Sequence, residues 1–270
     1  MTTKPFKFHD KSYVLQKIRR ILRTDPVLTV HQLEHRLDFS PIEWLIKPTA
    51  RDWWDLLVKE GFACTELRLK ISVGARVKTS EQFVCSSERI SHFSDWNLRQ
   101  LAGLAALRYG LGIRPDNWQL RALERTNQSN DPIPDAMIHL ARATNPQIAQ
   151  GDSVKIQGLR LTPKAKPEAV IAVEWDSGSA TRDKISHKIL NYSQVATSQI
   201  WAVPTQHRAE TINQLLQASL SPAASMVVTV DWRTAKLIRL MLPYRGGDLD
   251  SILSRVVSIA APWKVHLSAA

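Results

Sequence analysis

The sequence predicts an α/β protein, α+β overall, with a helical N-terminal domain (residues 1–90) followed by an α/β domain (91–270). Two observations carry this prediction. Apolar residues recur at helical spacing in the first part and then alternate along two short runs, whereas helices and β-like runs follow one another in the second part. The 270 residues, 44% of them apolar, can bury a core in each domain.

The chain is strongly basic. Lys and Arg outnumber Asp and Glu by 36 to 25, which gives a formal net charge of +11. Such a charge attracts polyanions, of which nucleic acid is the most common. No run approaches the roughly 20 apolar residues that cross a bilayer, and the first ten residues have no apolar signal core. We therefore expect a cytoplasmic protein that binds DNA and no membrane.

Three helices and a hairpin are expected in the first domain. Residues 1–24 hold seven Lys or Arg against one acid, and their apolar residues recur at helical spacing, which predicts a helix with one cationic face. Thr29 caps a second helix, and a third ends at Gly61. The alternating runs 64–73 and 77–85 then form a β-hairpin.

This order of elements is that of a winged helix, in which one helix enters the major groove of DNA and the hairpin lies beside it. The alternative for the cationic helix is an ordinary solvated face. The long irregular stretch 144–167 adds further basic residues, and loops of that length often carry function. The expected DNA contacts are Arg19, Arg20, Arg51, Lys59, Arg68, Lys70, Arg76, Lys78, Lys164 and Lys166.

The two cysteines are not spaced as in a metal site. Cys64 and Cys85 fall in the two runs of the hairpin, so they are expected on neighbouring strands. In a reducing cytosol we interpret them as buried free thiols rather than as a disulfide.

The second domain should contain a central mixed sheet. A helix over 95–110 ends at Gly110, and two more helices are expected over 182–195 and 209–220. Short β-like runs lie before, between and after the later helices. These runs are 118–123, 133–140, 168–175, 199–203, 226–231 and 235–242.

Two acids stand at the ends of apolar β-like runs. Asp135 follows Pro134, and Glu174 closes the run that starts at residue 168. Two such carboxylates suit Mg²⁺ or Mn²⁺, hard cations that take oxygen ligands and are often held by one or two protein carboxylates plus water and phosphate. Such a metal polarises a phosphate and lowers the pKa of an attacking water. The sequence therefore offers a candidate metal site.

The order and spacing of these motifs resemble two known families. The second domain resembles the PD-(D/E)xK restriction-endonuclease-like core, and the whole chain is similar to the replication-relaxation family of mobile-element proteins, in which a winged-helix region precedes three short motifs. In this sequence those motifs are Pro134-Asp135, Glu174-x-Asp176-x-Gly178 and Lys188-x-x-x-Tyr192.

The resemblance implies roles for individual residues. Asp135 and Glu174 would be catalytic acids and, with Asp176, metal ligands. The nuclease signature has Lys two positions after the Glu, where this chain has Asp176. The comparison then puts the catalytic cation on the following helix, where Lys188 is the first choice and Lys184, four residues before it, the second.

Three functions remain open. The first is a Mg²⁺- or Mn²⁺-dependent DNA endonuclease or nickase in the replication, mobilisation or transposition of a plasmid or another mobile element. The second is a non-catalytic winged-helix factor of replication or transcription with a degenerate nuclease fold. In the third, the α/β domain docks a partner protein. A second copy of the chain or a protein of the same mobile element are the alternative partners besides DNA. Arg208 is either a phosphate ligand or an ordinary surface residue.

Overall fold

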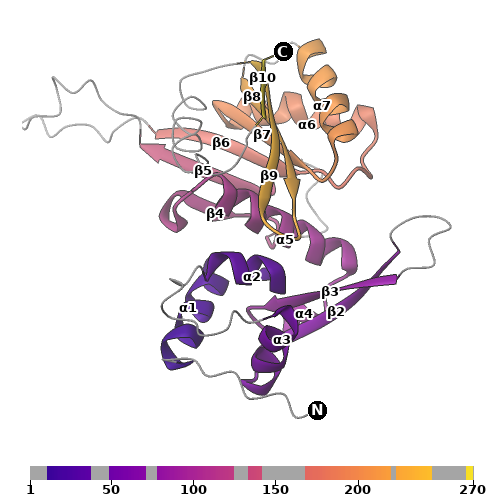
Figure 1. The fold of residues 1–270 in the computed structure, drawn as a ribbon. Coiled ribbons are helices and arrows are strands. Elements are labelled where there is room, and N and C mark those ends of the chain that lie inside the picture. Colours follow the sequence, from indigo (N-terminus) through magenta and orange to yellow (C-terminus); the bar gives the residue numbers. More distant parts are fainter. Residues whose placement is uncertain are drawn as a thin grey trace, which may run out of the picture.

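The structure is a computed structural model that describes residues 11–37, 49–70, 78–124, 133–141, 168–219, 223–244 and 266–269. It has a mixed α/β fold with a small antiparallel sheet and a larger mixed sheet (Figure 1), as the sequence predicts at this level. Among the described residues, no helix is long and apolar enough to cross a membrane.

The first part of the chain contains three main helices and a three-stranded antiparallel sheet in the order β1-β3-β2. The expected hairpin is confirmed as β2 and β3, whereas β1 and the short α4 were not expected. The elements are α1 (Lys11–Thr24), β1 (Val27–Thr29), α2 (Val30–Arg36), α3 (Ala50–Lys59), β2 (Ala63–Lys70), β3 (Lys78–Cys85) and α4 (Glu88–Ser91).

The caps of α3 follow from local sequence. The Thr49 hydroxyl accepts the backbone N–H of Asp52 at 3.2 Å, and the Asp52 carboxylate accepts the backbone N–H of Thr49 at 2.8 Å. The carboxylate also accepts a hydrogen bond from the Thr49 hydroxyl at 2.7 Å. The hydrogen bonds that it accepts, first the one from the Thr49 backbone and then the one from the hydroxyl, lower the pKa of Asp52. Gly61 has a φ of 71°, a backbone conformation that favours glycine. The helix ends just before this residue, as predicted.

The second part builds a seven-stranded sheet in the order β10-β9-β8-β7-β6-β5-β4. Strands β6, β7 and β8 run parallel to one another, as do β9 and β10, and the other neighbours are antiparallel. The elements are α5 (Asp95–Gly110), η1 (Pro115–Asn117), β4 (Trp118–Leu120), β5 (Ala136–Ala141), β6 (Glu168–Trp175), α6 (Arg182–Val195), β7 (Ser198–Val203), α7 (Gln206–Ala218), β8 (Ala224–Asp231), β9 (Lys236–Tyr244) and β10 (His266–Ala269).

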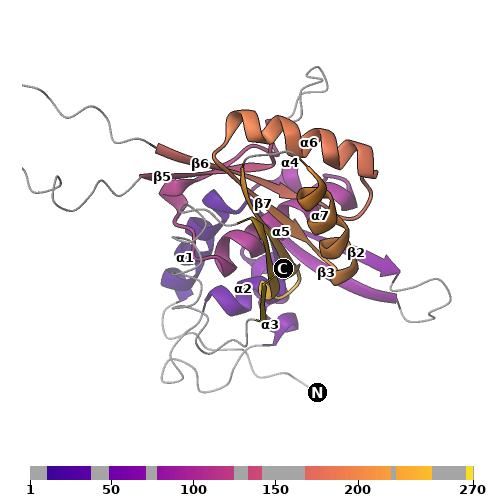
Figure 2. The same cartoon turned by 90° about the horizontal axis from the view of Figure 1, so that it is seen from above.

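Helices cover both faces of the larger sheet. On one face, Val173 and Trp175 of β6 pack in the same core cluster as Leu104 and Leu107 of α5. On the other face, Ala172 packs with the buried residues of α6 and α7, and these two helices lie side by side in Figures 1 and 2. Because side chains alternate along a strand, Glu174 points to the same face as Ala172.

Helix α5 joins the two parts of the chain (Figure 1). Its residues Leu98 and Leu101 pack with Val27 and Phe83 of the small sheet, while Leu104 belongs to the core of the larger sheet. The helix has no polar face along much of its length, because it is enclosed from both sides. The domain boundary after residue 90 stays a prediction, and α5 contributes to both cores.

The cysteines lie on neighbouring strands, as expected. Cys64 pairs with Val84 and Ala63 with Cys85 in the hairpin, and both thiols are free. Burial raises the pKa of Cys64 to about 11 and that of Cys85 to about 12. Both cysteines are therefore unreactive apolar residues near neutral pH.

Gly103→Ala in α5 is expected to destabilise the protein. A Cβ at this position would lie 2.6 Å from the indole ring of Trp175, which is only 3% exposed. Overpacking of this kind costs about 1–3 kcal/mol, against a gain of about 1 kcal/mol in helix propensity. Urea denaturation would measure the loss. In a Trp175→Leu background the added methyl group should cost less, and an equal cost in both backgrounds would contradict the close packing.

Candidate functional site

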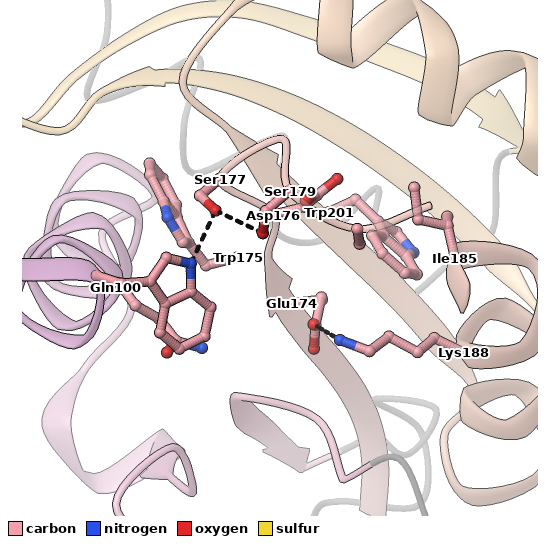
Figure 3. Close-up of a pocket in the computed structure, with 11 residues that line it drawn as sticks. Gln100, Glu174, Trp175, Asp176, Ser177, Ser179, Ile185, Lys188 and Trp201 are labelled. Atoms are coloured by element: carbon pink, nitrogen blue, oxygen red, sulfur yellow. Dashed lines mark hydrogen bonds and ion pairs between the residues drawn. The ribbon is translucent and has the colours of Figure 1, made fainter. Parts of the chain in front are cut away.

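A small pocket lies at the carboxyl end of β6, beside the parallel strand β7 (Figure 3). In open α/β sheets this end of the parallel strands is where ligands bind. We call it the β6 pocket. Its cavity volume is about 40 Å³, room for a few water molecules. It is lined by residues of α5, β6, β7, α6 and the loop before α6, namely Trp96, Gln100, Glu174, Trp175, Asp176, Ser177, Ser179, Ala180, Ile185, Lys188 and Trp201.

Glu174 is the carboxylate in the centre of this pocket, and it is 3% exposed. Its Oε1 accepts a hydrogen bond from Lys188 Nζ, and its Oε2 accepts one from the Tyr192 hydroxyl at 2.7 Å. Both donors come from α6, where they are four residues apart and share a face. Thr181 caps this helix by accepting the backbone N–H of Lys184 at 3.4 Å. The cap fixes where α6 begins, and the helix in turn places the Lys188 ammonium group beside Glu174.

Asp135 lies next to Glu174 but behind the pocket. Ala136, the first residue of β5, pairs with Val173 of β6, so Asp135 just before β5 lies near the end of β6 that carries Glu174. The Asp135 side chain is fully buried. Its Oδ1 accepts a hydrogen bond from Gln100 Nε2 at 2.7 Å and its Oδ2 one from the backbone N–H of Trp175 at 2.8 Å. Gln100 lines the pocket, so Asp135 also fixes the orientation of a pocket residue.

Asp176 has a different partner. Its Oδ2 accepts a hydrogen bond from Arg208 Nε at 2.6 Å, and its Oδ1 accepts the backbone N–H of Gly178 at 3.0 Å. Gly178 has a φ of 99°, which closes the turn between β6 and α6. Arg208 also donates to the carbonyl of Ala180 at 2.6 Å. Arg208 therefore ties the start of α7 to the loop that forms one wall of the pocket.

The structure separates the two candidate lysines. Lys188 lines the pocket and pairs with Glu174, whereas Lys184 is exposed and is not among the lining residues. The three predicted metal ligands do not form one cluster. In the part of the chain that the structure describes, no group of three or more His, Cys, Asp or Glu residues could hold a metal ion. Asp176 is engaged by Arg208 instead.

The sequence-based prediction gave no role to three residues of the site, namely Tyr192, Gln100 and Trp96. Tyr192 had a signal, since it closes the Lys-x-x-x-Tyr motif. Gln100 and Trp96 had none, because α5 reaches the pocket only through the packing of the sheet. Trp96 Nε1 donates to Ser177 Oγ at 3.0 Å, and Ser177 and Ser179 share a hydrogen bond of 3.4 Å.

The predicted DNA contacts are only partly described. Arg19 and Arg20 of α1 and Arg51 and Lys59 of α3 are exposed. Arg19 also lies over the ring of Phe62, 5.3 Å from its centroid. For the other predicted contacts the structure does not describe the side chains; these residues are Arg68, Lys70, Arg76, Lys78, Lys164 and Lys166.

The two helices differ in charge. Helix α1 has five Lys or Arg and no acid, whereas α3 balances Arg51 and Lys59 with Asp52 and Asp55. Of these two helices, α1 therefore carries the excess positive charge.

The chain was compared with known proteins. No protein-family model, no curated protein and no solved structure matches it.

Proposed function

We propose that the protein is a metal-dependent DNA endonuclease or nickase with a winged-helix domain and a PD-(D/E)xK-like domain, acting for a plasmid or another mobile element. The observation that carries this proposal is the β6 pocket. Glu174 and Lys188 meet there, and Asp135, just before β5, accepts the backbone N–H of the residue that follows Glu174. A carboxylate pair beside a cation is the set of groups that phosphodiester hydrolysis needs.

In this proposal Glu174, with Asp135 near it, would hold Mg²⁺ or Mn²⁺, since such cations often take only one or two protein carboxylates and complete their shell with water and phosphate. The groups that would bind the ion are carboxylate oxygens, and a cavity of about 40 Å³ suits a small ion with some of its water. Each carboxylate oxygen offers two lone-pair sites, so Glu174 can keep its hydrogen bonds while it binds a cation. Glu174 faces the cavity directly, whereas direct ligation by Asp135 requires an exchange of its contact with Gln100. When bound, the metal supplies a Lewis acid for the phosphate and acidifies an attacking water.

The chain's own residues supply the rest. Lys188 Nζ, held at the pocket by Glu174, can neutralise charge that develops on the phosphate. Tyr192 orients Glu174 through its hydroxyl. Arg208 is already paired with Asp176, so its contribution is to hold the loop that forms the wall of the site.

The N-terminal part supplies the affinity for DNA in this proposal. Its order of elements, with a sheet of order β1-β3-β2, fits a winged helix. Because α1 carries the excess positive charge, we assign the main phosphate contacts to Arg19 and Arg20 and a smaller share to Arg51 and Lys59. Binding of this kind weakens steeply as salt rises.

Glu174→Gln is expected to abolish cleavage. The amide keeps the shape of the side chain and an acceptor for Tyr192 but removes the charge that holds a cation, so the rate should fall at least about 100-fold. Supercoiled and linear DNA would be incubated with the full chain and Mg²⁺, Mn²⁺ or EDTA. Asp135→Asn should also reduce the rate, whereas Asp183→Asn, an exposed acid on α6, serves as the control. DNA affinity in EDTA should stay unchanged in all three variants. A wild-type protein that leaves DNA intact with both metals would refute the nuclease.

A non-catalytic DNA-binding factor is the second candidate, and one observation favours it. Each of the three acids at the site has an internal partner, namely Lys188 and Tyr192 for Glu174, Gln100 for Asp135 and Arg208 for Asp176. The fold therefore satisfies these carboxylates without a metal. This candidate predicts salt-dependent DNA binding and no cleavage by the wild-type chain.

A further inference from the structure

Trp96 is an exposed aromatic residue at the rim of the β6 pocket. Its side chain is 45% exposed although it belongs to the first turn of α5, a helix that is otherwise largely buried. The indole Nε1 donates to Ser177 Oγ at 3.0 Å. One edge of the ring is thereby fixed to the loop between β6 and α6, so the ring is held in place although much of it is open to solvent.

The size of the pocket determines what can lie against this ring. Trp96 lines the same cavity as Glu174 and Lys188. Gln100 and Ser177 line it too, and Figure 3 shows these two residues with Glu174 and Lys188. A cavity of about 40 Å³ has room for an ion with water or for phosphate oxygens, and it is too small for a nucleobase. A nucleotide whose phosphate reaches Lys188 must therefore leave its base outside the cavity, at the rim that Trp96 occupies.

We propose that Trp96 stacks against an unpaired base of the DNA strand whose phosphate enters the β6 pocket. Flat aromatic side chains beside a phosphate site bind bases by stacking, whatever the base. In an intact duplex both faces of each base are covered by its neighbours, so a base on Trp96 must be unpaired or at a strand end. The substrate class at this site is then single-stranded DNA or DNA with a locally unpaired segment. This inference rests on the proposed nuclease function and specifies its substrate.

The chemistry of the loop supports a nucleic-acid ligand. The Ser177 hydroxyl contacts the indole and the Ser179 hydroxyl lies beside that of Ser177, and both can donate to phosphate or sugar oxygens. Lys188, which lines the same cavity as Trp96, supplies a positive charge. An apolar ring that shares a cavity with hydroxyl groups and a cation matches a base linked to a sugar phosphate better than it matches an apolar protein surface.

The test compares Trp96→Leu with Trp96→Phe in the full chain. Both variants lose the hydrogen bond to Ser177, but only Phe keeps an aromatic face. Binding to a fluorescent 12-residue oligothymidine and to a duplex of the same length would be measured by anisotropy in EDTA. Trp96→Leu should weaken binding of the single strand by about 5- to 150-fold, Trp96→Phe should retain most of the affinity, and neither should change duplex binding. Ile238→Ala, which removes another exposed apolar side chain outside the pocket lining, is the control.

Several outcomes would overturn the proposal. They are equal single-strand affinity in the Leu variant and the wild type, equal losses in the Leu and Phe variants, equal losses for single strand and duplex, and a wild type that does not bind the single strand. Because binding is measured without metal, this test is separate from cleavage. Binding through Trp96 without cleavage would refute the nuclease alone, and cleavage that is insensitive to Trp96→Leu would refute the stacking role alone.

Discussion

Lys188→Met should reduce metal-dependent DNA cleavage at least about 100-fold, whereas Lys184→Met should leave the rate within about twofold of the wild type. Lys188 Nζ donates a hydrogen bond to the Glu174 carboxylate in the β6 pocket, while Lys184 is exposed on the same helix and does not line the pocket. Methionine keeps most of the length of the lysine stem and removes only the charge. The pair therefore tests the position of the cation rather than the charge of α6.

The measurement is the initial rate of nicking of supercoiled DNA at saturating Mg²⁺. Thermal unfolding of both variants provides the control for folding. Removal of Lys188 leaves the hydrogen bond from Tyr192 to Glu174 in place, so a modest loss of stability is expected. Equal rates in Lys188→Met and the wild type would remove Lys188 from the mechanism, and a larger loss in Lys184→Met would reverse the assignment.

The sequence was a good guide to the elements of secondary structure. The mixed α/β fold, the hairpin and the central mixed sheet are confirmed. Periodicity and caps are local signals, so Gly61 predicted the end of α3 closely. Strand β1 was missed because its three residues carry too little alternation to be recognised. Strand β5 begins at Ala136 rather than at residue 133, which leaves Asp135 just before the strand.

The site was harder to predict because its contacts are tertiary. In the structure Lys188 pairs with Glu174, and Asp135 accepts the backbone N–H of Trp175, the residue after Glu174. The motifs grouped Asp176 with the metal ligands, but β6 ends at Trp175 and the next residue turns toward Arg208 of α7. No sequence signal links Asp176 to a residue 32 positions later. Likewise, Gln100 reaches Asp135 only because α5 packs across the sheet.

The contact between the N-terminal part and α5 contains a buried charged group that the sequence did not suggest. Asp25, between α1 and β1, accepts hydrogen bonds from Arg36 Nη1 at 2.5 Å and from Arg108 Nε at 2.8 Å. All three residues are buried. Arg108 also donates to the carbonyl of Ile113 at 2.8 Å, and Arg36 donates to that of Ala105. One carboxylate thus compensates two guanidinium groups that connect α2 with α5.

Asp25→Ala should destabilise the protein by about 3–5 kcal/mol, because it leaves two buried cations without a counter-charge. Burial lowers the pKa of Arg36, and the nearby Asp25 carboxylate opposes this shift. The loss is a large part of the roughly 5–15 kcal/mol that stabilise a typical domain. Urea denaturation, followed by tryptophan fluorescence, would measure it. Asp55→Ala, an exposed acid on α3, should cost less than about 0.5 kcal/mol.

A rescue variant separates the effect of charge from that of packing. If uncompensated charge causes the loss, replacement of Asp25 by Leu together with Arg36→Met and Arg108→Met should recover much of the stability, because apolar groups of similar size can replace a buried ion network at little cost. If Asp25→Ala unfolds at the same urea concentration as Asp55→Ala, the two arginines must find other partners and the network does not hold α2 to α5. A loss in Asp25→Ala that the triple variant does not recover would assign the effect to the hydrogen bonds at Ala105 and Ile113, which hold the ends of the two guanidinium groups.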